Sequence, residues 1–284
     1  MQSIRWRRIC QALCAALTNS YWFSLVSRTI YQGPLKGFCV PALNCYACPL
    51  AVFACPIGTI QYFLAHGAYY ITLYTIGILG ITGALIGRMA CGWICPFGLL
   101  QDLLHKIRSR KFSLPRWLSC GKYAALGILV LAIPFLTKQP WFCKLCPAGG
   151  LEGAIPMLIL EPSLRELLGG MFVLKVLIVV FFLAAMVAVK RPFCRAACPL
   201  GAIFSFFNRA SVLRLSVDQT KCTKCNKCNK VCPTDIKVYE DPNAADCIRC
   251  LDCKDVCPEN AISYGLAGFA VKEPKETPAK CVIR

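Results

Sequence analysis

The sequence contains four long stretches that are almost free of charged residues, and they constrain its fold more than any other feature. The stretches lie between Arg8 and Arg28 and at about Phe63–Gly87, Leu118–Leu136 and Leu167–Val189. A helix of about 20 apolar residues crosses the hydrocarbon core of a bilayer, which is roughly 30 Å thick. The first stretch is the least regular, because polar residues (Thr18, Asn19, Ser20) lie at its centre. We therefore expect a mainly α membrane protein with four transmembrane helices.

Composition supports a membrane protein and divides the chain into two parts. Of the 284 residues, 57% are hydrophobic and 16% are charged, whereas about a quarter of a soluble domain is usually charged. Residues 1–214 carry 21 Lys and Arg against 4 Asp and Glu, and residues 215–284 carry 11 against 10. A protein that binds nucleic acid through a basic surface does not segregate its charge in this way. We therefore expect no nucleic-acid partner.

The basic residues also predict the orientation of the chain in the membrane. With the N-terminus inside, the inner segments hold 15 Lys and Arg, and the outer loops hold 5. Cytoplasmic loops of membrane proteins carry this excess of positive charge. We therefore expect a multi-pass protein of the cytoplasmic (inner) membrane whose N- and C-termini are both cytoplasmic.

A tetrapeptide, Cys-Pro-x-Gly, recurs four times, each time with another cysteine shortly before it. The copies begin at Cys55, Cys95, Cys146 and Cys198. Proline suits the first position of a helix, and a thiolate just before it meets the positive end of the helix dipole. The copies alternate with the predicted transmembrane helices, so they fall in turn on the outer and inner faces. We therefore expect an internally duplicated arrangement with metal-binding cysteines on both faces.

The cysteines around these repeats predict two metal clusters in the membrane part. Four thiolates complete one [4Fe–4S] cluster, and the inner face offers four: Cys91, Cys95, Cys194 and Cys198. The outer face offers six candidates for four positions: Cys39, Cys45, Cys48, Cys55, Cys143 and Cys146.

Two interpretations of the outer cysteines follow from their spacing. Pairing the two Cys-x-x-Cys units selects Cys45, Cys48, Cys143 and Cys146, whereas the repeat argues for including Cys55. Zinc is the alternative to iron for any such set of thiolates. Disulfides are a further alternative for the outer cysteines.

The C-terminal part carries the most specific pattern in the chain. Two runs of the form Cys-x2-Cys-x2-Cys-x3-Cys-Pro begin at Cys222 and Cys247. In bacterial two-cluster ferredoxins, the fourth cysteine of each run ligates the other cluster. We expect one [4Fe–4S] cluster on Cys222, Cys225, Cys228 and Cys257, and a second on Cys247, Cys250, Cys253 and Cys232. Together with the membrane part, this predicts three to four clusters.

With these motifs the chain resembles the membrane-bound polyferredoxins of the NapH/NosR type. The resemblance covers most of the chain and rests on CGWICPFGLLQD (91–102), CRAACPLGAI (194–203) and the double cysteine run. It implies a four-helix membrane protein that passes electrons between the quinone pool and redox partners. The outer motifs NCYACPLAVFACPIG and CKLCPAGG depart from that pattern. They suggest that electrons also reach the outer face.

The motifs divide the chain into three parts. We expect a membrane domain at residues 1–214, a two-cluster ferredoxin domain at 215–265 and a C-terminal tail at 266–284. The function that we expect is an electron-transfer subunit of a membrane redox complex, without substrate chemistry of its own. It would connect a cytoplasmic electron carrier with the quinone pool or an outer-face redox protein. The alternative is an enzyme in its own right, either a quinol dehydrogenase or a metal-ion reductase.

Two residues are candidates for binding a quinone. Lys175 lies within the fourth predicted span, and His66 follows the first Cys-Pro repeat. An ionisable residue inside a transmembrane segment favours a functional role. The alternative is that Lys175 extends to the membrane surface and that His66 is a structural residue.

Overall fold

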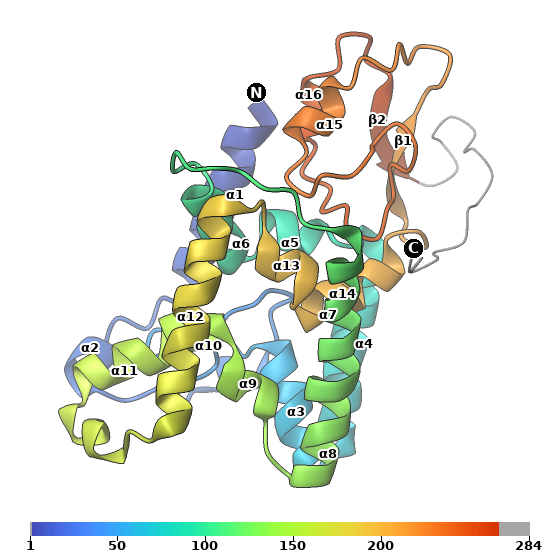
Figure 1. The fold of residues 1–284 in the computed structure, drawn as a ribbon. Coiled ribbons are helices and arrows are strands. Elements are labelled where there is room, and N and C mark those ends of the chain that lie inside the picture. The colour runs from blue at the N-terminus through green and yellow to red at the C-terminus, as the bar shows by residue number, and fades with distance from the viewer. Residues whose placement is uncertain (1, 267–284) are drawn as a thin grey trace.

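The computed structural model describes residues 2–266. The chain forms a helical part followed by a small C-terminal domain (Figure 1). The helical part begins with α1 (Gln2–Thr18) and ends with α14 (Pro199–Phe207). The C-terminal domain begins with strand β1 (Leu213–Val217) and ends with β2 (Ile262–Leu266). The position of β1 agrees with the change in charge pattern near residue 215.

Two helices are long and apolar enough to cross a membrane. The first covers Trp117–Thr137 and the second is α12 (Gly170–Ala188). The first consists of four consecutive segments: η2 (Arg116–Cys120), α7 (Gly121–Ala124), the π-helical η3 (Ala125–Ala132) and α8 (Ile133–Thr137). In α12 the buried residues are Val179 and Met186, so most of its apolar side chains are available to face lipid. These helices coincide with the third and fourth predicted spans.

The first predicted span is not a single helix, which corrects the expectation for Arg8–Arg28. α1 ends at Thr18, whose side chain donates to the carbonyl of Cys14, and α2 (Ser24–Ser27) is a separate short helix. The backbone N–H of Val52 donates to the carbonyl of Thr18, so the chain turns at this point. Polar side chains that bond to nearby backbone groups compete with continuation of the helix.

The second predicted span is divided into α3 (Pro56–Ala65) and α4 (Tyr69–Ile86). Gly67 lies between them with φ of +73°, a conformation that glycine adopts without strain. α4 is apolar, but its apolar stretch is shorter than those of the two long helices. Four transmembrane helices therefore stay a prediction, and two of them have the required length.

All four Cys-Pro repeats begin a helix, which confirms the predicted helix starts. In each copy the cysteine is the N-cap and the proline is the first residue, in α3, α6 (Pro96–Leu104), α10 (Pro147–Gly149) and α14. In three copies the preceding cysteine lies on a short helix: α5 (Met89–Trp93), α9 (Trp141–Leu145) and α13 (Pro192–Ala196). α10 continues through η4 (Gly150–Ala154) into α11 (Ile155–Leu160), and short η1 (Pro34–Gly37) and η5 (Pro162–Leu167) lie in loops.

The C-terminal domain is small and packs on the helical part. Its strands pair antiparallel with Leu215 opposite Tyr264, and the short helices α15 (Lys227–Val231) and α16 (Asp252–Asp255) lie within the two cysteine runs. Arg7 of α1 forms an ion pair with Asp252 of α16 at 3.3 Å. In Figure 1 the helices α5 and α13 lie between this domain and the helices α3, α9 and α10.

Candidate metal centres

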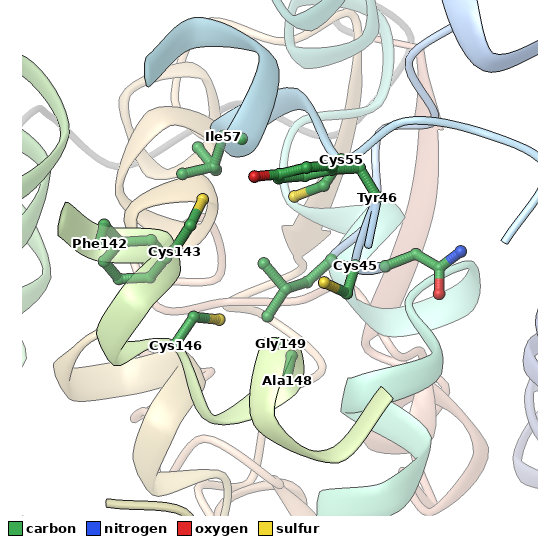
Figure 2. A pocket seen from close by; sticks show the side chains of 12 residues that line it. Cys45, Tyr46, Cys55, Ile57, Phe142, Cys143, Cys146, Ala148 and Gly149 are labelled. Carbon is green, nitrogen blue, oxygen red and sulfur yellow. The ribbon is translucent and has the colours of Figure 1, made fainter. Parts of the chain in front are cut away.

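Four cysteines from separate parts of the chain line one pocket, and we call them the outer set (Figure 2). Cys55 and Cys146 are the N-caps of α3 and α10, Cys143 lies on α9, and Cys45 comes from the loop before α3. The rings of Tyr46 and Phe142 also line the pocket. The two halves of the predicted duplication therefore each contribute two sulfur atoms.

The other two outer candidates do not line this pocket. The sulfur of Cys48 lies 3.7 Å from the side-chain oxygen of Asn19, and the sulfur of Cys39 lies 3.5 Å from the hydroxyl of Thr59. The structure thus brings together the set that includes Cys55, as the repeat argued. It does not bring Cys48 into the set, as the pairing of Cys-x-x-Cys units had suggested.

The glycines of two repeats lie where a side chain would meet close neighbours. A Cβ atom at Gly58 would lie 2.7 Å from the Tyr46 ring and 3.6 Å from the Cys143 sulfur. A Cβ atom at Gly201 would lie 3.1 Å from the carbonyl oxygen of Cys194. A side chain at either position would displace a neighbour, Tyr46 at Gly58 and Arg88 at Gly201.

The outer set is surrounded by buried groups that include one carboxyl. Glu152 accepts a hydrogen bond from the backbone N–H of Cys45 at 2.8 Å, and burial raises the pKa of Glu152 to about 7. Burial also raises the pKa of the Cys45 thiol to about 11, although the nearby positive charge of Lys175 lowers this pKa slightly. Free of metal, these thiols would be protonated at neutral pH.

A second group of four buried cysteines forms the inner set: Cys91, Cys95, Cys194 and Cys198. Cys91, Cys95 and Cys198 belong to one buried cluster of side chains. Burial and the nearby Cys194 and Cys91 together raise the pKa of Cys95 to about 12. Their exposed fractions are 4–6%. The sequence-predicted inner residues therefore lie together in the structure.

Two buried arginines bracket the inner set. Arg88 donates to the carbonyl of Cys194 at 2.7 Å, and Arg191 donates to the carbonyl of Cys91 at 3.2 Å. Arg88 is paired with Asp246, and Arg191 is paired with Asp102. Buried positive charge next to thiolates stabilises an anionic cluster.

In the C-terminal domain, one set of cysteines lies near the surface. Cys222, Cys225 and Cys228 line a pocket together with Cys257, the last cysteine of the other run. Cys225 is exposed, and Lys224 and Lys227 line the same pocket. We call these four cysteines the first tail set.

The second tail set is buried and has the complementary membership: Cys232, Cys247, Cys250 and Cys253. Burial, together with the neighbouring Cys232, raises the pKa of Cys247 to about 11. The backbone repeats between the two runs, with positive φ at Lys224 and Asn226 in one and at Arg249 and Leu251 in the other. Left-handed residues that alternate with other conformations turn successive backbone N–H groups toward an enclosed anion.

Each of the four sets offers four cysteine sulfurs as metal ligands. Within residues 2–266, no three His, Cys, Asp or Glu side chains are placed to hold one metal ion. Four sulfurs on a zinc ion would lie only about 3.8 Å apart, because each Zn–S bond is about 2.3 Å long. A cluster of four irons holds its four thiolates around a volume instead of a point. The donor chemistry, four cysteines in each set, fits [4Fe–4S] clusters.

The two candidate quinone residues have different surroundings. His66 is exposed, stacks on Tyr62 and lies 2.8 Å from the Tyr62 carbonyl through Nδ1. The side chain of Lys175 lies against Gly150, close to the outer set. No contact that joins His66 with Lys175 is present in the described part of the chain, so a shared quinone site stays a prediction.

Two glutamines contact the cysteine sets, and the sequence reasoning missed them. Gln61 Nε2 lies 3.3 Å from the Cys143 sulfur, and Gln101 Nε2 lies 2.8 Å from the Cys194 sulfur. Each follows the cysteine of its Cys-Pro repeat by six positions. Extending the repeat from Cys-Pro-x-Gly to Cys-Pro-x-Gly-x-x-Gln would have revealed them.

Comparison with known proteins agrees with this chemistry. A family model described as a 4Fe-4S binding domain matches residues 68–115, 124–155 and 170–217, and another of the same description matches residues 215–237. An uncharacterised protein of Methanocaldococcus jannaschii is 30% identical over 223 residues, which cover 75% of this chain and 87% of that protein.

Two named relatives are ferredoxin-type proteins. The ferredoxin-type protein NapH of Escherichia coli is 26% identical, over 82% of this chain and 76% of that protein. The methylamine utilization ferredoxin-type protein MauN of Methylobacillus flagellatus is 25% identical, over 56% of this chain and 53% of that protein. No solved structure matches the chain significantly.

Proposed function

Because the chain belongs to the NapH-type polyferredoxins, we propose that it is a membrane-embedded electron-transfer subunit with four [4Fe–4S] clusters. It passes electrons between a cytoplasmic carrier and the membrane or outer face, as one subunit of a redox complex. Bound clusters supply reversible one-electron chemistry. The chain itself holds the clusters at short separations, excludes water from three of them and exposes the fourth to a partner.

The observation that carries this proposal is the direct contact between the inner set and the second tail set. Gly92, next to Cys91, packs so closely on the carbonyl of Ile248 that a Cβ atom would lie 2.5 Å from its oxygen. The indole N–H of Trp93 donates to the carbonyl of Arg249 at 3.0 Å. Ile248 and Arg249 separate two ligands of the second tail set. The two sets are therefore in contact through residues next to their ligands, which supports electron exchange between them.

The first tail set supports a cytoplasmic partner at the other end of the domain. Its exposed Cys225 lies beside Lys224 and Lys227, whose side chains are also exposed. Positive charge around an exposed cluster attracts and orients a carrier with an acidic face. We therefore propose that a soluble, acidic electron carrier docks on this surface.

An open apolar cavity of about 440 Å³ is lined by residues of both the outer and the inner motifs. Phe142, Leu145 and Pro147 contribute from the outer motif, and Phe193 and Ala197 contribute from the inner motif. Side chains of α12 and of the helix Trp117–Thr137 complete its wall. This cavity favours a second candidate function, quinol oxidation, in which a quinone ring would bind between the two sets and away from His66.

An iron count on the full chain, purified in detergent, tests the principal proposal. Four clusters require about sixteen irons per chain, whereas the tail clusters alone require about eight. A redox titration followed by electron paramagnetic resonance should then resolve four one-electron centres. About eight irons, with the outer cysteines in disulfides, would contradict the proposal. Oxidation of quinol by the same preparation, with an artificial acceptor, would favour the second candidate.

A further inference from the structure

Each membrane-side cysteine set has one buried amide aimed at one of its sulfurs. Gln61 and Gln101 both have an exposed fraction of 0%. Gln61 of α3 reaches Cys143 on α9, and Gln101 of α6 reaches Cys194 on α13. In both cases the amide starts in one half of the duplication and contacts the first cysteine of the motif from the other half.

The same repeat position has diverged in the other two copies. Six residues after Cys146 the chain has Glu152, and six residues after Cys198 it has Phe204. Glu152 contacts its partner motif through the backbone N–H of Cys45 and not through a sulfur. Phe204 is buried and has no group to donate. Among the described residues, each set therefore has a single side-chain amide directed at a sulfur, although the repeat occurs twice around each set.

The surroundings of Gln61 fix the orientation of its amide. The backbone N–H of Phe142 donates to Gln61 Oε1 at 3.0 Å, so Nε2 is the atom that faces Cys143. Around Gln101, Nε2 also donates to the carbonyl of Phe97, and Oε1 has no partner among the described residues. Turning this amide over would point its oxygen at a thiolate, which repels it. Both glutamines are thus oriented as donors to sulfur.

We propose that Gln61 and Gln101 are positioning residues that set the reduction potentials of the outer and inner clusters. The inference rests on the proposed cluster function. A hydrogen bond to a ligating sulfur stabilises the reduced cluster, which carries one more negative charge than the oxidised cluster. Each amide therefore raises the midpoint potential of its own cluster, and the two clusters are adjusted independently.

Replacing each glutamine with methionine tests the proposal, because methionine has a similar length and cannot donate. In a redox titration of the full chain, Gln61→Met should lower the midpoint potential of the outer cluster alone. Gln101→Met should lower that of the inner cluster alone, so each variant is the control for the other. Phe204→Leu changes the same repeat position without removing a donor and should leave all potentials unchanged. Unchanged potentials in both methionine variants would overturn the assignment.

A measurement on the unsubstituted chain covers the case in which a variant loses its cluster. With ¹⁵N in the glutamine side chains, pulsed electron resonance should detect one nitrogen coupled to each membrane-side cluster when reduced. The absence of this coupling would overturn the proposal. Iron content separates this failure from that of the proposed function. About sixteen irons without coupling refutes only the glutamine role, whereas about eight irons refutes the membrane-side clusters themselves.

Discussion

Cys48 and Cys55 are both followed by proline, yet only Cys55 lines the outer pocket. The two segments differ at the fourth position, which is Ala51 after Cys48 and Gly58 after Cys55. Gly58 packs against the Tyr46 ring, where a methyl group has no room. The chain after Cys48 forms turns and no helix. The glycine of the repeat therefore distinguishes the cysteine that joins the set from its neighbour.

Serine substitutions at these two cysteines should have unequal effects. Cys55→Ser removes a thiolate of the outer set, so we expect the loss of one cluster, or about four irons per chain. Cys48→Ser changes a thiol that faces Asn19 and should leave the iron content unchanged. Iron analysis and electron resonance on the purified chains would measure both. Equal loss of iron in the two variants would show that Cys48 is also an iron ligand.

Cysteine spacing predicted most of the candidate site, because the tail runs and the inner repeats place their sulfurs by local chain geometry. It left the outer set ambiguous, since Cys45 joins from a loop whose path depends on packing against Gly149 and Gly153. It missed Gln61 and Gln101 altogether. Their shared position, six residues after the cysteine of the repeat, was a signal in the sequence. Their contact with a sulfur from the other half depends on the packing of distant segments, and spacing alone does not show it.

At the scale of elements, α1 is a link between the two parts of the molecule. Arg7 lies between Asp102 of α6 at 3.4 Å and Asp252 of α16 at 3.3 Å, with its side chain 4% exposed. Asp102 also accepts two hydrogen bonds from Arg191, at 2.7 and 2.6 Å. The sequence suggested a transmembrane helix here from its apolar composition. Apolar composition alone does not reveal that Asp102 and Asp252, which are distant in the sequence, hold the start of α1 through Arg7.

Replacing Asp102 with asparagine should destabilise this junction strongly. Removing one partner from a buried ion pair costs about 3–5 kcal/mol, because the remaining charge stays buried. Here two guanidinium groups would lose their shared carboxylate. Thermal unfolding in detergent should show the loss as a lower Tm. Asp241→Asn is the matched control, since its pair with Arg209 is 43% exposed on both sides and should contribute little.

The effect of Asp102→Asn should also have a defined pH dependence. Burial alone raises the pKa of Asp102, but Arg191 and Arg7 outweigh burial and hold the pKa below its usual value. A carboxyl with a lowered folded-state pKa contributes stability above its unfolded value of about 3.9 and loses it as the pH falls through the folded-state pKa. The stability difference between the two proteins should therefore be constant from about pH 5.5 to 8. A difference that shrinks within this range would show that Asp102 is not held ionised.

At the scale of the whole molecule, the C-terminal domain is fixed to the helical part by several buried contacts around the inner set. Arg88 and Lys122 both pair with Asp246, and Asn208 donates to the carbonyl of Cys247 at 2.7 Å. The domain and its two cysteine runs were predictable from sequence because each run is local. Its docking position was not, because it depends on contacts between residues that are far apart in the sequence, such as Arg88 and Asp246, which are 158 positions apart.

Substitution of Gly92 with alanine should loosen this docking without removing any ligand. The new methyl group would meet the backbone oxygen of Ile248 at 2.5 Å, and a backbone atom cannot rotate away as a side chain can. Overpacking of this kind costs about 1–3 kcal/mol, which corresponds to weakening of docking by roughly fivefold to 150-fold. Magnetic coupling between the reduced inner cluster and the second tail cluster should therefore weaken, while the iron content stays the same.

The control for this variant is Gly77→Ala in α4, where a Cβ atom meets nothing within 4 Å. It should preserve both the coupling and the iron content, because helix propensity favours alanine over glycine by about 1 kcal/mol. Full coupling in the Gly92→Ala chain would mean that the second tail set does not reach the inner set through this contact. Electrons would then have to leave the C-terminal domain by another route, and the continuous path from the first tail set to the inner set would be refuted.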